Sequence, residues 1–162
     1  MAIRIKDKNE LFSLIGKIYW VETQLELSSQ WDAYFLVKEQ KHRDIMFRIS
    51  HDSEAHKAIV KLVADHLVGM DLNNVKEEIK DVGYNFRKLH VEEIMAEVMR
   101  YEELAKDLYS KIYGLTNPDI IKKIWKGDEP TDYFKLMKWL LSQENAHIKM
   151  LKPYAGQIER IL

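Results

Sequence analysis

The sequence predicts an all-α protein of one domain, residues 1–162, folded as an antiparallel four-helix bundle. Of the 162 residues, 46% are hydrophobic and 31% are charged, with only 6 Gly and 3 Pro, a composition that suits long amphipathic helices. Hydrophobic residues recur at alternating steps of four and three along four segments, as in helices that bury one face. Residues 70–84 lose this periodicity, which predicts one long connection between the second and third helices.

The four helices are expected at about residues 7–40, 43–69, 86–113 and 131–152, in up-down-up-down order. Gly114 is a plausible cap of the third helix, and Pro153 is expected to end the fourth. A short helix is expected at 75–79 within the long connection. The residues that form the four seams are Leu11, Ile15, Ile18, Glu22, Leu25, Ser29 and Asp32; Met46, Ile49, Ser53, His56, Val60 and Val63; Val91, Met95, Val98, Glu102, Ala105, Tyr109 and Ile112; and Tyr133, Met137, Leu140, Glu144, His147 and Leu151.

The seams of the two halves of the chain match each other. A shift of 80 residues superposes the first seam on the third and places Glu22 on Glu102. A shift of 91 residues superposes the second seam on the fourth and places His56 on His147. Each half therefore reads as a helical hairpin that carries a Glu on its first helix and a His on its second.

These polar seam residues form a candidate metal site. Glu144 and His147 lie three residues apart, so they are separated by roughly 60° around a helix and can converge on one ion. Glu22 and Glu102 lie midway along their seams and would meet them near the bundle centre, together with His56. Buried carboxylates and imidazoles must protonate, hydrate or bind cations. Oxygen and imidazole ligands suit iron or manganese.

With this residue set the chain resembles the ferritin-like superfamily, and within it the rubrerythrin-type di-iron proteins. The run Gln143-Glu144-Asn145-Ala146-His147 is similar to the pattern of the family's fourth helix. The resemblance implies two iron (or manganese) ions. Glu22 and His56 would be terminal ligands of one ion, Glu102 and His147 terminal ligands of the other, and Glu144 the bridging ligand. It also implies reaction with peroxide, dioxygen or ferrous iron, as a peroxidase, oxidase or ferroxidase.

The second helix departs from the family pattern. The family has a bridging Glu three residues before its His, where this chain has Ser53. Asp52 lies about 40° from His56 around the helix and is the residue that could replace it, with a shorter reach. Glu54 should point outward. The position of Asp52, as a ligand or in solvent, stays open on the sequence alone.

Two further departures concern activity. Ala105 stands one turn after Glu102, where rubrerythrins with peroxidase activity carry an additional ligand Glu. The chain has no Cys, so it lacks the fused rubredoxin module, and electrons would have to come from a separate electron-transfer protein. The rival hypothesis is a non-catalytic helical scaffold or interaction protein with a degenerate metal site, and Ser53 is the feature that favours it.

Charge and hydropathy indicate the compartment and the partners. The formal charge of −1 gives no reason to expect binding to nucleic acid or to an anionic membrane. The sequence shows neither a signal peptide nor a run of about 18 apolar residues, and we expect a cytoplasmic protein. Trp20, Trp31 and Phe35 lie outside the main seam, which predicts an exposed apolar surface and a homodimer.

Some aromatic and His residues have simpler interpretations. Tyr19, Tyr101 and Tyr109 are expected to pack in the core, with hydrogen bonds to ligand residues or radical chemistry as the alternatives. His66 lies too far along its helix from the other ligand candidates and is expected to have a structural role.

Overall fold

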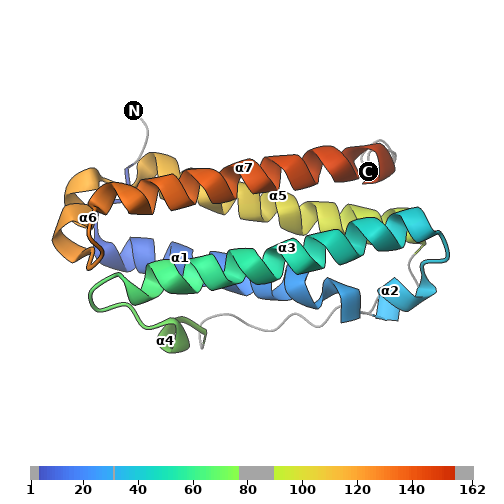
Figure 1. Ribbon diagram of the computed structural model, residues 1–162, viewed down its shortest axis with the longest axis horizontal. Helices are drawn as coiled ribbons and strands as arrows, with labels where there is room; N and C mark the ends of the chain where they lie inside the picture. Colours follow the sequence, from blue (N-terminus) through green and yellow to red (C-terminus); the bar gives the residue numbers. More distant parts are fainter. Residues whose placement is uncertain (1–3, 31, 77–89, 156–162) are drawn as a thin grey trace.

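The computed structural model describes residues 4–30, 32–76 and 90–155. Four long helices dominate it (Figure 1). They are α1 (Lys8–Glu26), α3 (Gln40–Asp65), α5 (Val91–Leu115) and α7 (Pro130–Ala155). Four shorter elements join them: the 3₁₀ helix η1 (Leu27–Gln30), α2 (Asp32–Leu36), α4 (Leu72–Lys76) and α6 (Pro118–Ile124). Across the described ranges there is no β-strand, only the isolated bridges Ile5–Thr116 and Leu67–Trp125. The all-α prediction is confirmed.

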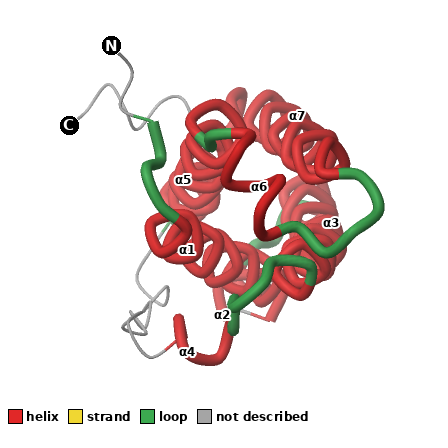
Figure 2. The backbone as a smooth tube through the Cα atoms, turned by 90° about the vertical axis from the view of Figure 1, so that its left-hand side faces the viewer, coloured by secondary structure: helices red, strands yellow, loops and turns green. Residues whose placement is uncertain are grey.

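The long helices surround a common core. Seen along the bundle, α1 lies between α3 and α5, and α7 closes the ring opposite α1 (Figure 2). In Figure 1, α1 and α7 run in one direction, and α3 and α5 run in the other. Each helix is therefore antiparallel to its two neighbours and parallel to the helix diagonally across the core.

This arrangement corrects the predicted up-down-up-down order, since the observed order is up-down-down-up. The start of α5 lies at the opposite end of the bundle from the end of α3 (Figure 1). α5 therefore repeats the direction of α3 instead of reversing it. The expected long stretch of chain between the second and third long helices is confirmed: it runs from the end of α3 at Asp65 to the start of α5 at Val91 and contains α4, and its residues 77–89 lie outside the described residues.

The four predicted seams are the core of the bundle. Among the seam residues whose side chains are described, all are buried except Val91, which is partly buried at the start of α5. The polar seam residues at mid-helix are therefore buried together with the hydrophobic ones on either side of them. The side chains of the seam positions Ser29 and Asp32 lie outside the described residues.

The first helix ends earlier than predicted. α1 stops at Glu26, and the chain continues through η1 and α2 instead of forming one helix to residue 40. The Ser50 hydroxyl of α3 donates to the backbone carbonyl of Glu26, one of the last carbonyls of α1. The N-terminus of α1 is capped by Asp7, whose Oδ1 accepts from the backbone N–H groups of Asn9 at 2.8 Å and Glu10 at 2.9 Å.

Other helix boundaries also differ from the prediction. α5 continues through Gly114 to Leu115, so Gly114 is not its cap. α7 passes Pro153 and ends at Ala155, less than one turn later. α3 ends at Asp65, before Gly69, which adopts a positive φ of 85° that glycine tolerates. The chain segment expected to be an irregular connector contains α6, capped by Asn117 with Pro118 in its first turn.

The described part of α4 covers residues 72–76, so the expected short helix at 75–79 lies largely outside the described residues. None of the described helices combines the length and the apolar character needed to cross a bilayer.

Candidate metal centre

Five polar seam residues meet in the interior of the bundle. Glu22 comes from α1, His56 from α3, Glu102 from α5, and Glu144 with His147 from α7. Three of the side chains are fully buried carboxylates, and the imidazoles of His56 and His147 are 1% and 3% exposed. All five predicted ligands therefore share one buried centre, which we call the Glu/His centre. Each occupies a core position of its helix, so folding the bundle brings them together.

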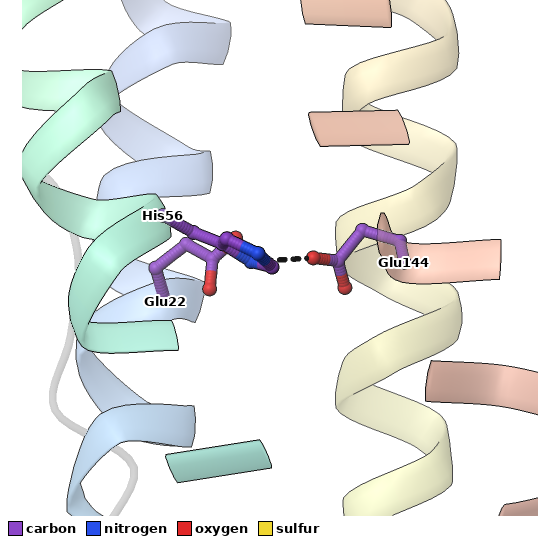
Figure 3. A group of neighbouring side chains, drawn as sticks. All are labelled: Glu22, His56 and Glu144. Atoms are coloured by element: carbon purple, nitrogen blue, oxygen red, sulfur yellow. Dashed lines mark ion pairs between the residues drawn. The ribbon is translucent and has the colours of Figure 1, made fainter. Parts of the chain in front are cut away.

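The first half of the Glu/His centre contains Glu22, His56 and Glu144. Figure 3 shows Glu22 lying beside His56, with the Glu144 carboxylate facing the His56 ring from the other side. Nδ1 of His56 lies 2.9 Å from Oε1 of Glu144 and 3.4 Å from Oε1 of Glu22. One ligand-type atom of each residue lies within 4.8 Å of the other two, a spacing that one metal ion could fill.

The second half contains Glu102, Glu144 and His147. Nδ1 of His147 lies 3.2 Å from Oε2 of Glu102, and the three residues again offer atoms within 4.8 Å of one another. Glu144 belongs to both halves. The Glu/His centre therefore consists of two groups of three residues, and Glu144 is the residue that they share.

Several carboxylate oxygens of the Glu/His centre have no hydrogen-bond partner. These are Oε2 of Glu22, Oε1 of Glu102 and both oxygens of Glu144, within the described residues. The close approach of His56 Nδ1 to Glu144 is poorly aligned for a hydrogen bond. Buried polar atoms are nearly always hydrogen-bonded, so four such oxygens in one place require another explanation. A cation coordinated by these atoms would satisfy them.

Burial and mutual repulsion strongly perturb the protonation of the Glu/His centre. Burial and the nearby charge of Glu144 raise the pKa of Glu22, and burial and Glu102 raise the pKa of Glu144 well above its ordinary value. Burial likewise raises the pKa of Glu102 to about 7. Burial alone would lower the pKa of His56, but the carboxylates of Glu144 and Glu22 outweigh it and raise that pKa to about 10. Without a cation, the Glu/His centre therefore favours its protonated forms.

Tyr109 holds one of the carboxylates in place. Its hydroxyl donates to Oε1 of Glu22 at 2.6 Å from a fully buried position on α5. Burial, together with the negative charge of Glu22, raises the pKa of Tyr109 well above its ordinary value, so the phenol stays a donor. Tyr109 thus both packs in the core and binds a candidate ligand. Tyr101 is buried and packs against the ring of Trp20, with 6.3 Å between ring centroids.

The structure does not bring Asp52 into either half of the Glu/His centre. Its side chain is 30% exposed, and its Oδ2 lies 3.0 Å from Nε2 of His147, the ring nitrogen that faces away from Glu102. Nε of Arg48 lies 3.7 Å from the same oxygen. Burial alone would raise the pKa of Asp52, but the contact with His147 and the charge of Arg48 hold it below its ordinary value. Asp52 therefore supports His147 from outside.

Ser53 stands three residues before His56, so α3 offers no carboxylate at that position. It is fully buried on the core face of α3, and its Oγ has no hydrogen-bond partner within the described chain. Glu54 is exposed, as expected.

Trp139 contacts the Glu/His centre in a way that the sequence did not predict. It is 44% exposed, yet its ring packs nearly perpendicular to the His56 ring, at a centroid distance of 5.8 Å. The His56 and His147 rings stack at 5.5 Å. His66 lies apart from them, where its Nδ1–H donates to the Leu62 carbonyl at 2.8 Å and its ring stacks on Trp125. The predicted structural role of His66 agrees with these contacts.

Comparison with known proteins finds no matching family model, no matching curated protein and no matching solved structure.

Proposed function

We propose that this chain is a ferritin-like di-metal carboxylate protein related to the rubrerythrin type. In this proposal it binds two iron or manganese ions and acts in the cytoplasm as an oxidoreductase on peroxide, dioxygen or ferrous iron. Glu22 and His56 hold one ion, Glu102 and His147 hold the other, and Glu144 bridges them. A separate electron-transfer protein supplies electrons, because the chain has no Cys for an electron-transfer centre of its own.

The observation that carries the proposal is the position of Glu144. It is the one residue common to both three-residue groups, and both of its oxygens lack a hydrogen-bond partner among the described residues. A structural carboxylate in a core is expected to accept hydrogen bonds, whereas a bridging ligand keeps its lone pairs for metal. The up-down-down-up helices and the long connection support the ferritin-like part of the proposal.

The bound ions would supply the redox chemistry, and the protein would set their surroundings. Glu22, Glu102 and Glu144 provide up to three negative charges against the charge of two divalent ions. Tyr109 fixes the orientation of Glu22, and Asp52 accepts from His147 Nε2–H, which leaves Nδ1 free to bind metal. Because the three Glu carboxylates are fully buried, ions bound to them would be shielded from bulk water.

A second candidate is a helical scaffold protein that has kept the fold without a working metal site. Ser53 favours it, because helix α3 then supplies only one ligand, His56. A protonated His56 between Glu22 and Glu144 would partly neutralise the Glu/His centre without metal, in accord with its pKa of about 10.

Metal analysis separates the two candidates. The protein is purified without chelators, and a second sample is stripped and reconstituted anaerobically with ferrous or manganous ion. The proposal expects about two ions per chain after reconstitution and, for the iron form, consumption of peroxide or dioxygen. Retention of no iron or manganese in either sample would reject it and support the scaffold.

A further inference from the structure

A pocket of about 340 Å³ opens on the surface between α3 and α7. It is lined by Arg48 from α3 and by Ala146, His147, Lys149 and Met150 from α7. Its volume lies at the small end of the range of ligand pockets. No step of the proposed metal chemistry uses Arg48, Lys149 or Met150, so the role of the pocket needs its own explanation.

The charges around the pocket favour a monoanion. Arg48 and Lys149 contribute two positive charges, and the neighbouring Asp52 contributes one negative charge. Nε of Arg48 lies 3.7 Å from Asp52, and the Arg48 side chain is 70% exposed, so its guanidinium has further N–H donors to offer a ligand. Lys149 is exposed and has no acidic partner among the described residues. The net charge of this group is therefore about +1.

The other lining residues favour a ligand with an apolar part. Ala146 and Met150 lie one helical turn apart on α7, on the same face as Lys149, and offer a methyl group and a flexible thioether. The imidazole of His147 also lines the pocket, and its nitrogens lie 3.2 Å from Oε2 of Glu102 and 3.0 Å from Oδ2 of Asp52. Hydrated inorganic oxyanions gain nothing from contact with apolar side chains, whereas a short aliphatic chain would bury apolar surface against them.

We propose that this pocket binds a small aliphatic monocarboxylate, with its carboxylate between Arg48 and Lys149 and its chain against Ala146 and Met150. The Arg48 guanidinium can donate two N–H groups to the two oxygens of a carboxylate, and the Lys149 ammonium adds a second positive charge. A bound ligand would cover the narrow strip where His147 reaches the surface. The site consists of residues of the pocket alone and does not depend on a bound metal.

The test is a titration of the full-length protein with butyrate, followed by calorimetry and by NMR of the Ala146 and Met150 methyl groups. Acetate and inorganic phosphate are compared under the same conditions. Butyrate should bind more tightly than acetate, by up to about fourfold for each buried methylene. Arg48→Gln and Lys149→Gln should each weaken butyrate binding about tenfold, because each removes a charged contact.

Lys138→Gln is the matched control. Lys138 is another exposed lysine of α7, and it lies eleven residues before Lys149, so it shares the same stripe of the helix three turns away. Its loss should leave butyrate binding unchanged. Met150→Gln keeps the side-chain length but removes the apolar wall, and should reduce the advantage of butyrate over acetate.

Three results would overturn the proposal. One is phosphate or acetate binding as tightly as butyrate, which would indicate a general attraction of anions. Another is an equal effect of Lys138→Gln and Lys149→Gln. The third is loss of butyrate binding after treatment with a chelator, which would place the carboxylate on a metal ion. Because binding is measured with and without metal, failure of this proposal leaves the metal proposal separately testable.

Discussion

Nε2 of His147 lies 3.0 Å from Oδ2 of Asp52, while Nδ1 of the same ring lies 3.2 Å from Oε2 of Glu102. The two nitrogens therefore have different partners, one at the protein surface and one in the core. A carboxylate that accepts from one ring nitrogen fixes the ring orientation and makes the other nitrogen a better ligand. Asp52 thus has a clear physical role although it is not in either half of the Glu/His centre.

The first prediction concerns this contact. Asp52→Ala should lower the affinity for one of the two ions by about tenfold or more, without changing the number of ions bound at saturation. The cause is the lost orientation of His147, whose ligand partners Glu102 and Glu144 remain. Competition with a chromogenic chelator measures the affinity. Glu54→Ala, at an exposed position next to Ser53, is the control and should match the wild type. Complete loss of one ion in Asp52→Ala would instead indicate that Asp52 is a direct ligand.

A second prediction distinguishes the shared carboxylate from an unshared one. Glu144→Gln should weaken the binding of both ions, because Glu144 belongs to both groups. Glu102→Gln should leave about one tightly bound ion per chain, held by Glu22, His56 and Glu144. Elemental analysis after gel filtration gives the ratio of metal to protein. Equal metal content in the two variants would contradict the bridging role of Glu144.

The third prediction is that the free energy of unfolding depends on pH differently in the metal-free and the metal-bound protein. The pKa of Glu102 is raised to about 7 and that of His56 to about 10, so the folded metal-free protein binds more protons than the unfolded chain. The stability from Glu102 is fully present below its unfolded pKa of about 4.5 and is lost as pH rises through 7. The stability from His56 is fully present below its unfolded pKa of about 6.5 and is lost as pH rises through 10.

Urea unfolding of the chelator-treated protein should therefore give a free energy of unfolding that falls between about pH 5 and pH 9. With metal bound, the same measurement should give a free energy that holds or rises across the lower part of this range, because metal competes with protons for the ligands. The control is Glu102→Gln, in which the fall between pH 5 and pH 7 should be smaller. A metal-free protein that became more stable with rising pH would contradict the protonation described for the Glu/His centre.

The five candidate ligands could be predicted from the sequence because helical periodicity alone determines which side chains face the core. Glu22 and Glu102 each stand in the middle of an apolar seam, and burying the hydrophobic residues of that seam buries these side chains with them. The position of Asp52 could not be predicted in the same way. It lies about 40° from His56, at the edge of the buried stripe, where a short side chain can face either the core or the surface.

The direction of the third long helix and the end of the first could not be predicted from helical periodicity either. α5 runs parallel to α3, and the periodicity of a helix carries no information about its direction. α1 ends where Ser50 of another helix donates to the Glu26 carbonyl. Trp20, expected on the surface, is partly buried against the core and Tyr101. Trp31 lies outside the described residues.

The fourth prediction is a homodimer formed through exposed apolar residues. Phe35 is 69% exposed, as expected, and Leu36 of α2 and Phe47 of α3 are also largely exposed. Light scattering at tens of micromolar protein should give the mass of two chains, and Phe47→Ser should shift the equilibrium toward one chain. Leu62→Ser, a similar change toward the other end of α3, is the control. A monomer in the wild type would contradict the prediction.

The last prediction concerns Ser53, which occupies a fully buried position one turn before His56. Ser53→Glu would add a carboxylate to the Glu/His centre from α3. In the metal-free protein this change should lower the midpoint of thermal unfolding, because another buried acid adds repulsion and the larger side chain crowds a packed core. In the metal-bound protein it should raise the affinity for the more weakly held ion, since the new carboxylate can coordinate both ions. Ser53→Gln has nearly the same size without the charge, so it should reproduce the loss of stability but not the gain in affinity. Calorimetry with chelator and with excess metal measures both effects. If Ser53→Glu and Ser53→Gln bound metal equally weakly, α3 would contribute only His56, and the centre would be complete with three carboxylates.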